Sequence, residues 1–164
     1  MPQLPQTTET LAVIFRKTVE TMKPNFPIIL ICNDAVDLIQ NEDNLRRGSL
    51  LGILKSKFNS TGYDNDGKLW ELEFHSDKLR DNFITRLLAN TIYNPKLQVT
   101  PKWRILREYN LIDLKNILAK YVADDDDFFT QFVEADVLIQ YIFEAKTFEE
   151  LYKILRRNVF EFEE

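Results

Sequence analysis

The sequence predicts an all-α fold or a helix-dominated α+β fold, built from stacked amphipathic helical hairpins with at most one short β-hairpin near residues 60–75. The chain has 164 residues, of which 45% are hydrophobic, so it can bury a substantial core. It contains only 4 Gly, and few of the turns that need a positive φ can therefore form. Apolar residues recur mostly at helical spacing. We expect one globular domain over residues 1–164, with residues 1–7 disordered.

The first part of the chain predicts two helices. An amphipathic stripe ends before Pro24. Its residues are Leu11, Ile14, Phe15, Thr18, Val19 and Met22. Over residues 26–40 the apolar positions also keep helical spacing, and Pro27 suits the first turn of a helix. The unbroken apolar run at 28–32 is equally typical of a buried strand, so a strand is the alternative there.

The middle of the chain contains the clearest β signal. A third helix is predicted over about residues 43–58, and the Asn-, Asp- and Gly-rich residues 59–68 indicate a loop. Apolar and acidic side chains then alternate over residues 69–74, which predicts a short, half-buried strand. Its candidate partner strand is residues 97–99.

The second half of the chain predicts helices separated by short breaks. Thr100-Pro101 has the pattern of a helix start, and Thr147-Phe148-Glu149-Glu150 has the pattern of a capping box. Four consecutive aspartates suit the positive end of a helix that follows them. The expected helices cover residues 77–93, 101–109, 111–121, 128–142 and 148–155.

Charge is spread unevenly along the chain. Residues 44–108 hold 12 basic and 7 acidic side chains (net +5), whereas residues 109–164 hold 6 basic and 13 acidic ones (net −7). The single cysteine excludes an intrachain disulfide and cysteine-based metal sites. No signal-peptide pattern and no apolar run of about 20 residues is present, so we expect a cytoplasmic protein without a membrane span.

The sequence predicts no catalytic residue and no cofactor. His75 is the only histidine, which excludes zinc sites built on several histidines. A Ser–His–Asp triad would have to use His75, and so would a dyad with Cys32. Cys32, however, lies in the most apolar stretch, where thiols are usually inert. No glycine-rich phosphate-binding loop occurs.

A calcium-loop pattern is incomplete around residues 62–73. Asp64, Asp66 and Glu73 would match ligand positions of an EF-hand loop, but Gly62 stands where the first ligand is needed. The Asp66-Gly67 turn of a β-hairpin explains the same residues. The prediction is therefore a hairpin without a metal.

Function is predicted from the remaining surface features. Helices that carry no catalytic or metal-binding residues can present surfaces for partner proteins. We therefore expect an interaction module, either an adaptor subunit or a small inhibitory, toxin-neutralising protein. Its acidic surface would select a basic partner. Homo-oligomers are compatible with this expectation. The candidate partner-binding residues are Asp124, Asp125, Asp126, Asp127, Glu161, Glu163 and Glu164.

Two alternatives belong to other classes. The first is a nucleic-acid-associated protein that uses the basic segment 44–108, where basic and aromatic side chains alternate. Its candidate residues are Arg46, Arg47, Lys102, Trp103, Arg104 and Arg107. The second is an enzyme with a carboxylate-based site, formed by Glu71 and Glu73 or by the aspartates 124–127.

Overall fold

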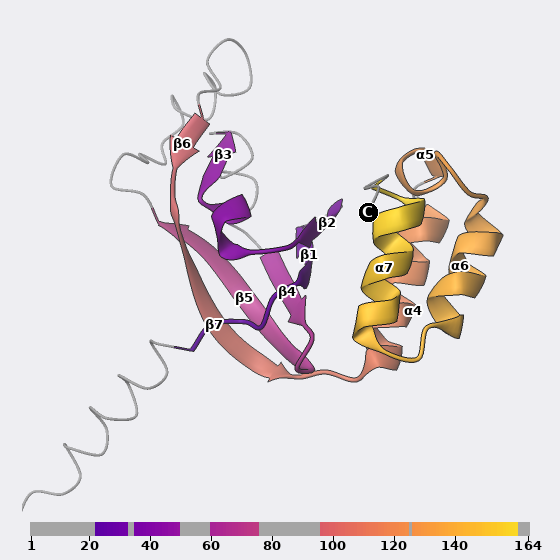
Figure 1. Ribbon diagram of the computed structural model, residues 1–164, viewed down its shortest axis with the longest axis horizontal. Coiled ribbons are helices and arrows are strands. Elements are labelled where there is room, and N and C mark those ends of the chain that lie inside the picture. Colours follow the sequence, from indigo (N-terminus) through magenta and orange to yellow (C-terminus); the bar gives the residue numbers. More distant parts are fainter. Residues whose placement is uncertain (1–21, 33–34, 50–59, 76–95, 125, 161–164) are drawn as a thin grey trace, which may run out of the picture.

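The protein consists of an antiparallel β-sheet with a layer of helices against one of its faces (Figure 1). The computed structural model describes residues 22–32, 35–49, 60–75, 96–124 and 126–160. The predicted helix over residues 77–93 lies outside the described residues, as do residues 1–21.

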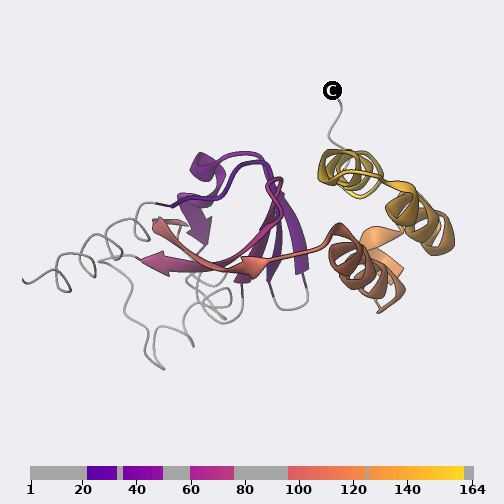
Figure 2. The ribbon, with the colours of Figure 1, turned by 90° about the horizontal axis from the view of Figure 1, so that it is seen from below.

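Five strands form the main sheet, in the spatial order β2-β1-β4-β5-β7, and all neighbouring strands are antiparallel. The strands are β1 (Ile28–Cys32), β2 (Ala35–Ile39), β4 (Ser60–Asp64), β5 (Lys68–His75) and β7 (Thr100–Glu108). Hairpins join β1 to β2 and β4 to β5, so sequence neighbours pair directly. The sheet is strongly curved when seen from below (Figure 2).

A smaller two-stranded sheet pairs β3 (Arg47–Ser49) with β6 (Lys96–Gln98). The 3-10 helix η1 (Glu42–Leu45) precedes β3 and is capped by the side chain of Asn41, which accepts from the backbone N–H of Asn44. Because β6 continues almost directly into β7, the small sheet extends one end of the main sheet.

The prediction of an all-α or helix-dominated fold, with repeat-like helical hairpins, is wrong. The main sheet is central, and the described helices form only the C-terminal part of the fold. The stretch 26–40 forms a strand hairpin instead of a helix, so the strand alternative for residues 28–32 is confirmed. The physical reason is that β1 is buried on both faces of the sheet and therefore reads as a continuous apolar run.

Three further expectations are corrected by the strands. The third predicted helix begins instead as η1 and β3, and residues 50–59 lie outside the described part of the chain. The expected loop 59–68 is mostly strand β4 and the start of β5. Strand β6 includes residues 97 and 98 as expected, but it pairs with β3, whereas β5 lies between β4 and β7.

The predicted helix over residues 101–109 is strand β7. Lys102 and Arg104 are exposed, while Trp103 and Ile105 are half-buried on the opposite face, which is the alternation of a strand. Pro101 suggested a first helical turn, but an edge strand such as β7 also tolerates proline near its start.

Other expectations are confirmed. Strand β5 has the predicted alternation, and Gly67 takes the positive φ of 76° that a tight turn between β4 and β5 needs. The described helices are α4 (Leu111–Asp124), the short α5 (Asp126–Phe129), α6 (Ala135–Glu144) and α7 (Phe148–Asn158). The predicted helix 128–142 is therefore divided into α5 and α6, whereas α4 and α7 were predicted as helices.

Both faces of the sheet carry apolar side chains. On one face, alternate residues such as Ile29, Leu38 and Tyr63 pack against buried residues of α4, α6 and α7. On the other face, Leu30 and Leu72 belong to a second apolar cluster, which includes η1. This two-faced burial explains why so few strand residues show the simple alternation of a half-exposed strand.

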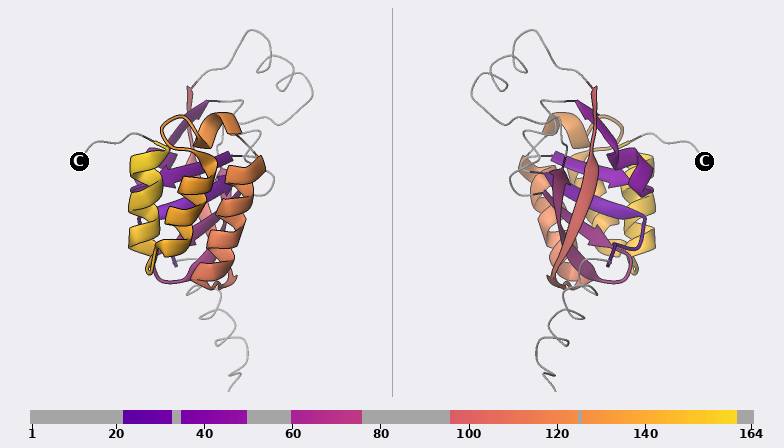
Figure 3. Two further views of the ribbon diagram at one scale, coloured as in Figure 1. Left: turned by 90° about the vertical axis from the view of Figure 1, so that its right-hand side faces the viewer. Right: turned by 90° about the vertical axis from the view of Figure 1, so that its left-hand side faces the viewer.

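Helix α6 lies furthest from the sheet, next to α4 and α7 (Figures 1 and 2), and Figure 3 shows these three helices side by side over the sheet. Within the described ranges, no helix is long and apolar enough to cross a membrane.

Candidate interaction surface

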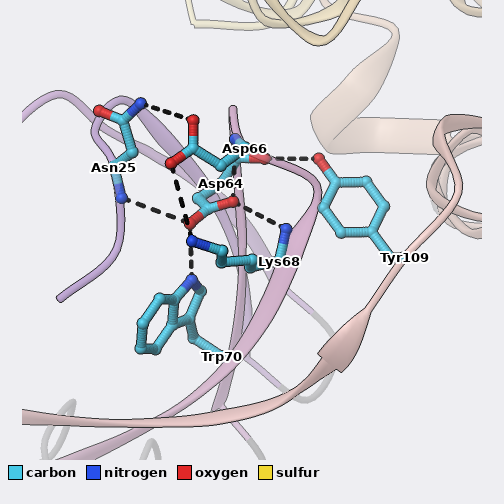
Figure 4. Close-up of polar contacts among 6 residues, drawn as sticks. All are labelled: Asn25, Asp64, Asp66, Lys68, Trp70 and Tyr109. Atoms are coloured by element: carbon cyan, nitrogen blue, oxygen red, sulfur yellow. Dashed lines mark hydrogen bonds and ion pairs between the residues drawn. The ribbon is translucent and has the colours of Figure 1, made fainter. Parts of the chain in front are cut away.

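Asp64 is a buried carboxylate whose oxygens face hydrogen-bond donors (Figure 4). Its Oδ1 accepts from the backbone N–H groups of Asp66 at 3.0 Å and Lys68 at 2.8 Å. Its Oδ2 accepts from the indole Nε1 of Trp70 at 2.7 Å and the backbone N–H of Asn25 at 3.3 Å. Four donors occupy the two oxygens, so Asp64 orders the β4–β5 turn and anchors the segment before β1.

The three calcium candidates are not brought together. Asp66 bonds the side chain of Asn25 at 3.0 Å, whereas Glu73 lies near the far end of β5, where its Oε2 is 3.4 Å from His75 Nε2. Among the residues described, no group of three acidic, histidine or cysteine side chains could hold a metal ion.

Cys32 and His75 lie on opposite faces of the sheet and on different strands. The Cys32 thiol donates to Ser60 Oγ at 3.1 Å, and burial raises the pKa of this thiol. The strand register separates the two residues by roughly 14 Å along and across the sheet. They therefore form no nucleophile–base pair.

The basic and aromatic candidates of β7 face away from each other. Arg104 is exposed and donates through Nε to Glu71 at 2.6 Å. Trp103 packs on the other face over Gly62, where an added Cβ would lie 3.1 Å from its ring. Stacked bases and neutralised phosphates need both kinds of group on one surface, and β7 separates them.

The remaining basic candidates are distributed over distant elements. Arg46 pairs with Asp43 at 3.2 Å next to η1, and Arg107 is exposed near the end of β7. The side chain of Arg47 lies outside the described part of the structure.

Only one of the predicted acidic residues is placed with its side chain. Asp124 is exposed at the C-terminal end of α4. For Asp126 and Asp127 the structure describes only the backbone, in α5, and Asp125, Glu161, Glu163 and Glu164 are outside the described residues. The acidic site expected at the end of the chain is therefore not assembled by the described residues.

The helical layer instead exposes large apolar side chains. Of the seven exposed large hydrophobic residues in the described part of the chain, five lie on this layer, each between 37% and 47% exposed. These five are Ile112, Phe128, Phe132, Tyr141 and Phe143. Tyr141 and Phe143 belong to α6, whose Leu138 and Ile142 are fully buried. Because Tyr141 and Phe143 are not on the buried face of α6, they are available for contacts outside the molecule.

The same segment is strongly acidic. Residues 121–145 contain seven acidic residues and no Lys or Arg. Asp124, Glu134, Asp136 and Glu144 are exposed, and none of these four makes an ion pair with a described residue. Acidic residues elsewhere do so: Glu71 pairs with Arg104 and Glu149 pairs with Lys153.

We call this combination the acidic–aromatic surface. It consists of Asp124, Phe128, Phe132, Glu134, Asp136, Tyr141, Phe143 and Glu144, on α5, α6 and the residues beside them. Of the residues of this surface, only Asp124 is among the partner-binding residues predicted from the sequence. The available signal was that α6 has more apolar residues than one helix face can bury.

Two interactions fix the end of α6. The buried Lys115 of α4 donates from Nζ to the backbone oxygen of Phe143 at 3.0 Å and to that of Ala145. A positive charge is favourable at the C-terminal end of a helix, where carbonyl groups lack partners. Thr147 then accepts from the backbone N–H of Glu150 and caps α7, as the capping box predicted.

Comparison of the chain with protein-family models, with curated proteins and with solved structures finds no match.

Proposed function

We propose that the protein is a protein–protein interaction module that binds its partner through the acidic–aromatic surface. The observation that carries this proposal is the concentration of exposed aromatic side chains on a helical segment that contains acidic residues but no basic ones. Aromatic residues are enriched in the centres of interfaces, and charged residues surround them at the rim.

The energetics of the surface support this proposal. Fully burying one large apolar side chain contributes about 1.5–3 kcal/mol. A few such anchors supply most of the binding energy in protein interfaces. Phe132, Tyr141 and Phe143 are each partly exposed and lie on or beside a helix that is held by Lys115. A pre-formed surface loses little conformational freedom when it binds. Adaptor subunits and small inhibitory proteins both use surfaces of this kind.

The proposal is tested by affinity capture from a lysate of the source organism, with nuclease present. The variant Phe132→Ser/Tyr141→Ser removes two anchors without changing the buried face of α6. We expect the captured partner to bind at least about 30-fold more weakly to this variant, the loss of roughly 2 kcal/mol that interface anchors produce.

The matched control is Leu106→Ser. Leu106 is as exposed as the anchors but lies on β7, at the sheet. Circular dichroism would establish that all variants are folded. Equal capture by wild type and by the double variant would contradict the proposed surface.

A further inference from the structure

The acidic–aromatic surface identifies the class of its partner, and this inference rests on the proposed function. We propose that the surface binds a cationic amphipathic helix of another protein, with Lys or Arg beside apolar side chains. Three properties of the surface lead to this occupant: its unpaired charge, its exposed aromatic residues and its helical backbone.

The acidic side chains of the surface have no paired cation among the described residues. Glu134 and Asp136 at the start of α6 and Glu144 at its end form no ion pair with a described Lys or Arg. Lys or Arg side chains of a partner would pair with these carboxylates and would accelerate the encounter. Nucleic acids, anionic membranes and an identical surface on a second copy would instead add negative charge.

The exposed aromatic side chains of the surface do not suit a partner that is only basic. Tyr141 and Phe143 lie on opposite flanks of α6, and Phe132 lies just before it. A segment of Lys alone would leave these rings in water. A segment with apolar side chains between its basic ones would cover the ring on the flank of α6 that it contacts and place its charges over the carboxylates beside it.

The helical backbone of the surface favours a partner that binds as a helix over one that binds as an extended peptide. A bound strand needs free backbone groups at a sheet edge, whereas the backbone groups along α6 are bonded within the helix. A partner helix satisfies its own backbone and presents only side chains. Helix α6 has 10 residues and is about 15 Å long, which matches a partner helix of about three turns.

The test uses the full chain and a synthetic peptide of about 18 residues, with Leu at helical spacing and Lys elsewhere. Titration calorimetry measures the affinity of the peptide for the protein. Three control peptides change one property each. The first has Glu in place of Lys, the second has Ser in place of Leu, and the third has two central prolines that prevent a helix. We expect tight binding only for the Lys–Leu helix, with affinity that falls as salt rises.

Variants of the protein locate the binding site. Glu134→Lys/Glu144→Lys reverses charge at the two ends of α6, so the effects on the helix dipole oppose each other. We expect this variant to bind the peptide at least about tenfold more weakly. The control Glu73→Lys/Glu108→Lys makes the same change in net charge at exposed positions of the sheet, and should change the affinity less than about threefold.

Each other result would overturn the inference. If the two charge variants lose affinity equally, the peptide is attracted by the net charge of the protein and not by this surface. If the Lys–Leu peptide does not bind, the proposed class of partner is wrong. If the proline peptide binds equally well, the partner is not a helix. The proposed function is separable from these results. A cellular partner that is lost with Phe132→Ser/Tyr141→Ser but kept by Glu134→Lys/Glu144→Lys would support the surface and contradict the cationic partner.

Discussion

At the scale of single residues, Asp64 shows how one buried charge organises a region without doing chemistry. Its carboxylate joins the segment before β1, the β4–β5 turn and the indole of Trp70. The Tyr109 hydroxyl also donates to the backbone oxygen of Asp64 at 2.7 Å, which connects this turn to the residues before α4. The acceptor role of Asp64 explains why an acidic residue is used inside the protein.

Replacing Asp64 by Asn should destabilise the fold. An Asn side chain would turn a donor toward N–H groups that need an acceptor, and hydrogen bonds to charged groups contribute about 1.5–3 kcal/mol. We therefore expect the free energy of unfolding to fall by about 2–3 kcal/mol in urea titrations. Asp66→Asn is the control, because the Asp66 side chain is exposed and, among the described residues, bonds the side chain of Asn25 and the neighbouring Lys68. Similar losses in both variants would contradict this role for Asp64.

Lys115 should be equally necessary at its own position. Lys115→Met keeps the length of the side chain but removes the donor to the backbone oxygens of Phe143 and Ala145. We expect a loss of about 1–3 kcal/mol in the free energy of unfolding, because two carbonyl groups at the end of α6 lose a charged partner. Lys120→Met, on the exposed side of the same helix, should cost less than about 0.5 kcal/mol.

At the scale of elements, structural features that depend on neighbouring residues could be predicted from the sequence, whereas the pairing of distant strands could not. The capping box of α7 and the alternation of β5 were correctly predicted because each depends on neighbouring residues. Strands β1 and β7 were misassigned because their patterns depend on what covers each face of the sheet. Strand β1 is buried on both faces and shows no period of two. In β7 the alternation ends at the exposed Leu106 and begins with Pro101, which also suits the first turn of a helix.

The candidate surface was predictable only in part, for a related reason. The absence of Lys and Arg from residues 121–145 is visible in the sequence. Which aromatic residues of that segment are buried is not, because Phe129 is fully buried while the adjacent Phe128 is exposed. Both residues belong to α5, where adjacent side chains point about 100° apart, so the placement of α5 in the fold decides which one is buried.

At the scale of the whole molecule, buried tyrosines make the stability of the fold sensitive to alkaline pH. Burial raises the pKa of Tyr63 and Tyr109 above the ordinary value of 10.0. Below about pH 10 both residues are neutral in the folded and unfolded states, and their contribution is fully present. Above it the unfolded chain releases protons that the folded chain retains, so stability is lost as pH rises.

We therefore expect the free energy of unfolding to decrease from about pH 10 upward. Urea titrations at a series of pH values would measure this decrease. In the Tyr63→Phe/Tyr109→Phe variant this decrease should be smaller, although its stability at neutral pH is lower because the bond to Asp64 is lost. An unchanged pH dependence in this variant would show that other groups control alkaline unfolding.

The proposed function also concerns the whole molecule, because it places partner binding on the helical layer and not on the sheet. The most direct measurement is hydrogen–deuterium exchange of the protein alone and in complex with the partner captured from the lysate. We expect slower exchange in α6 and the residues just before it, with β7 unchanged. Slower exchange confined to β7 or to the other strands of the sheet, with α6 unchanged, would contradict binding through the helical layer.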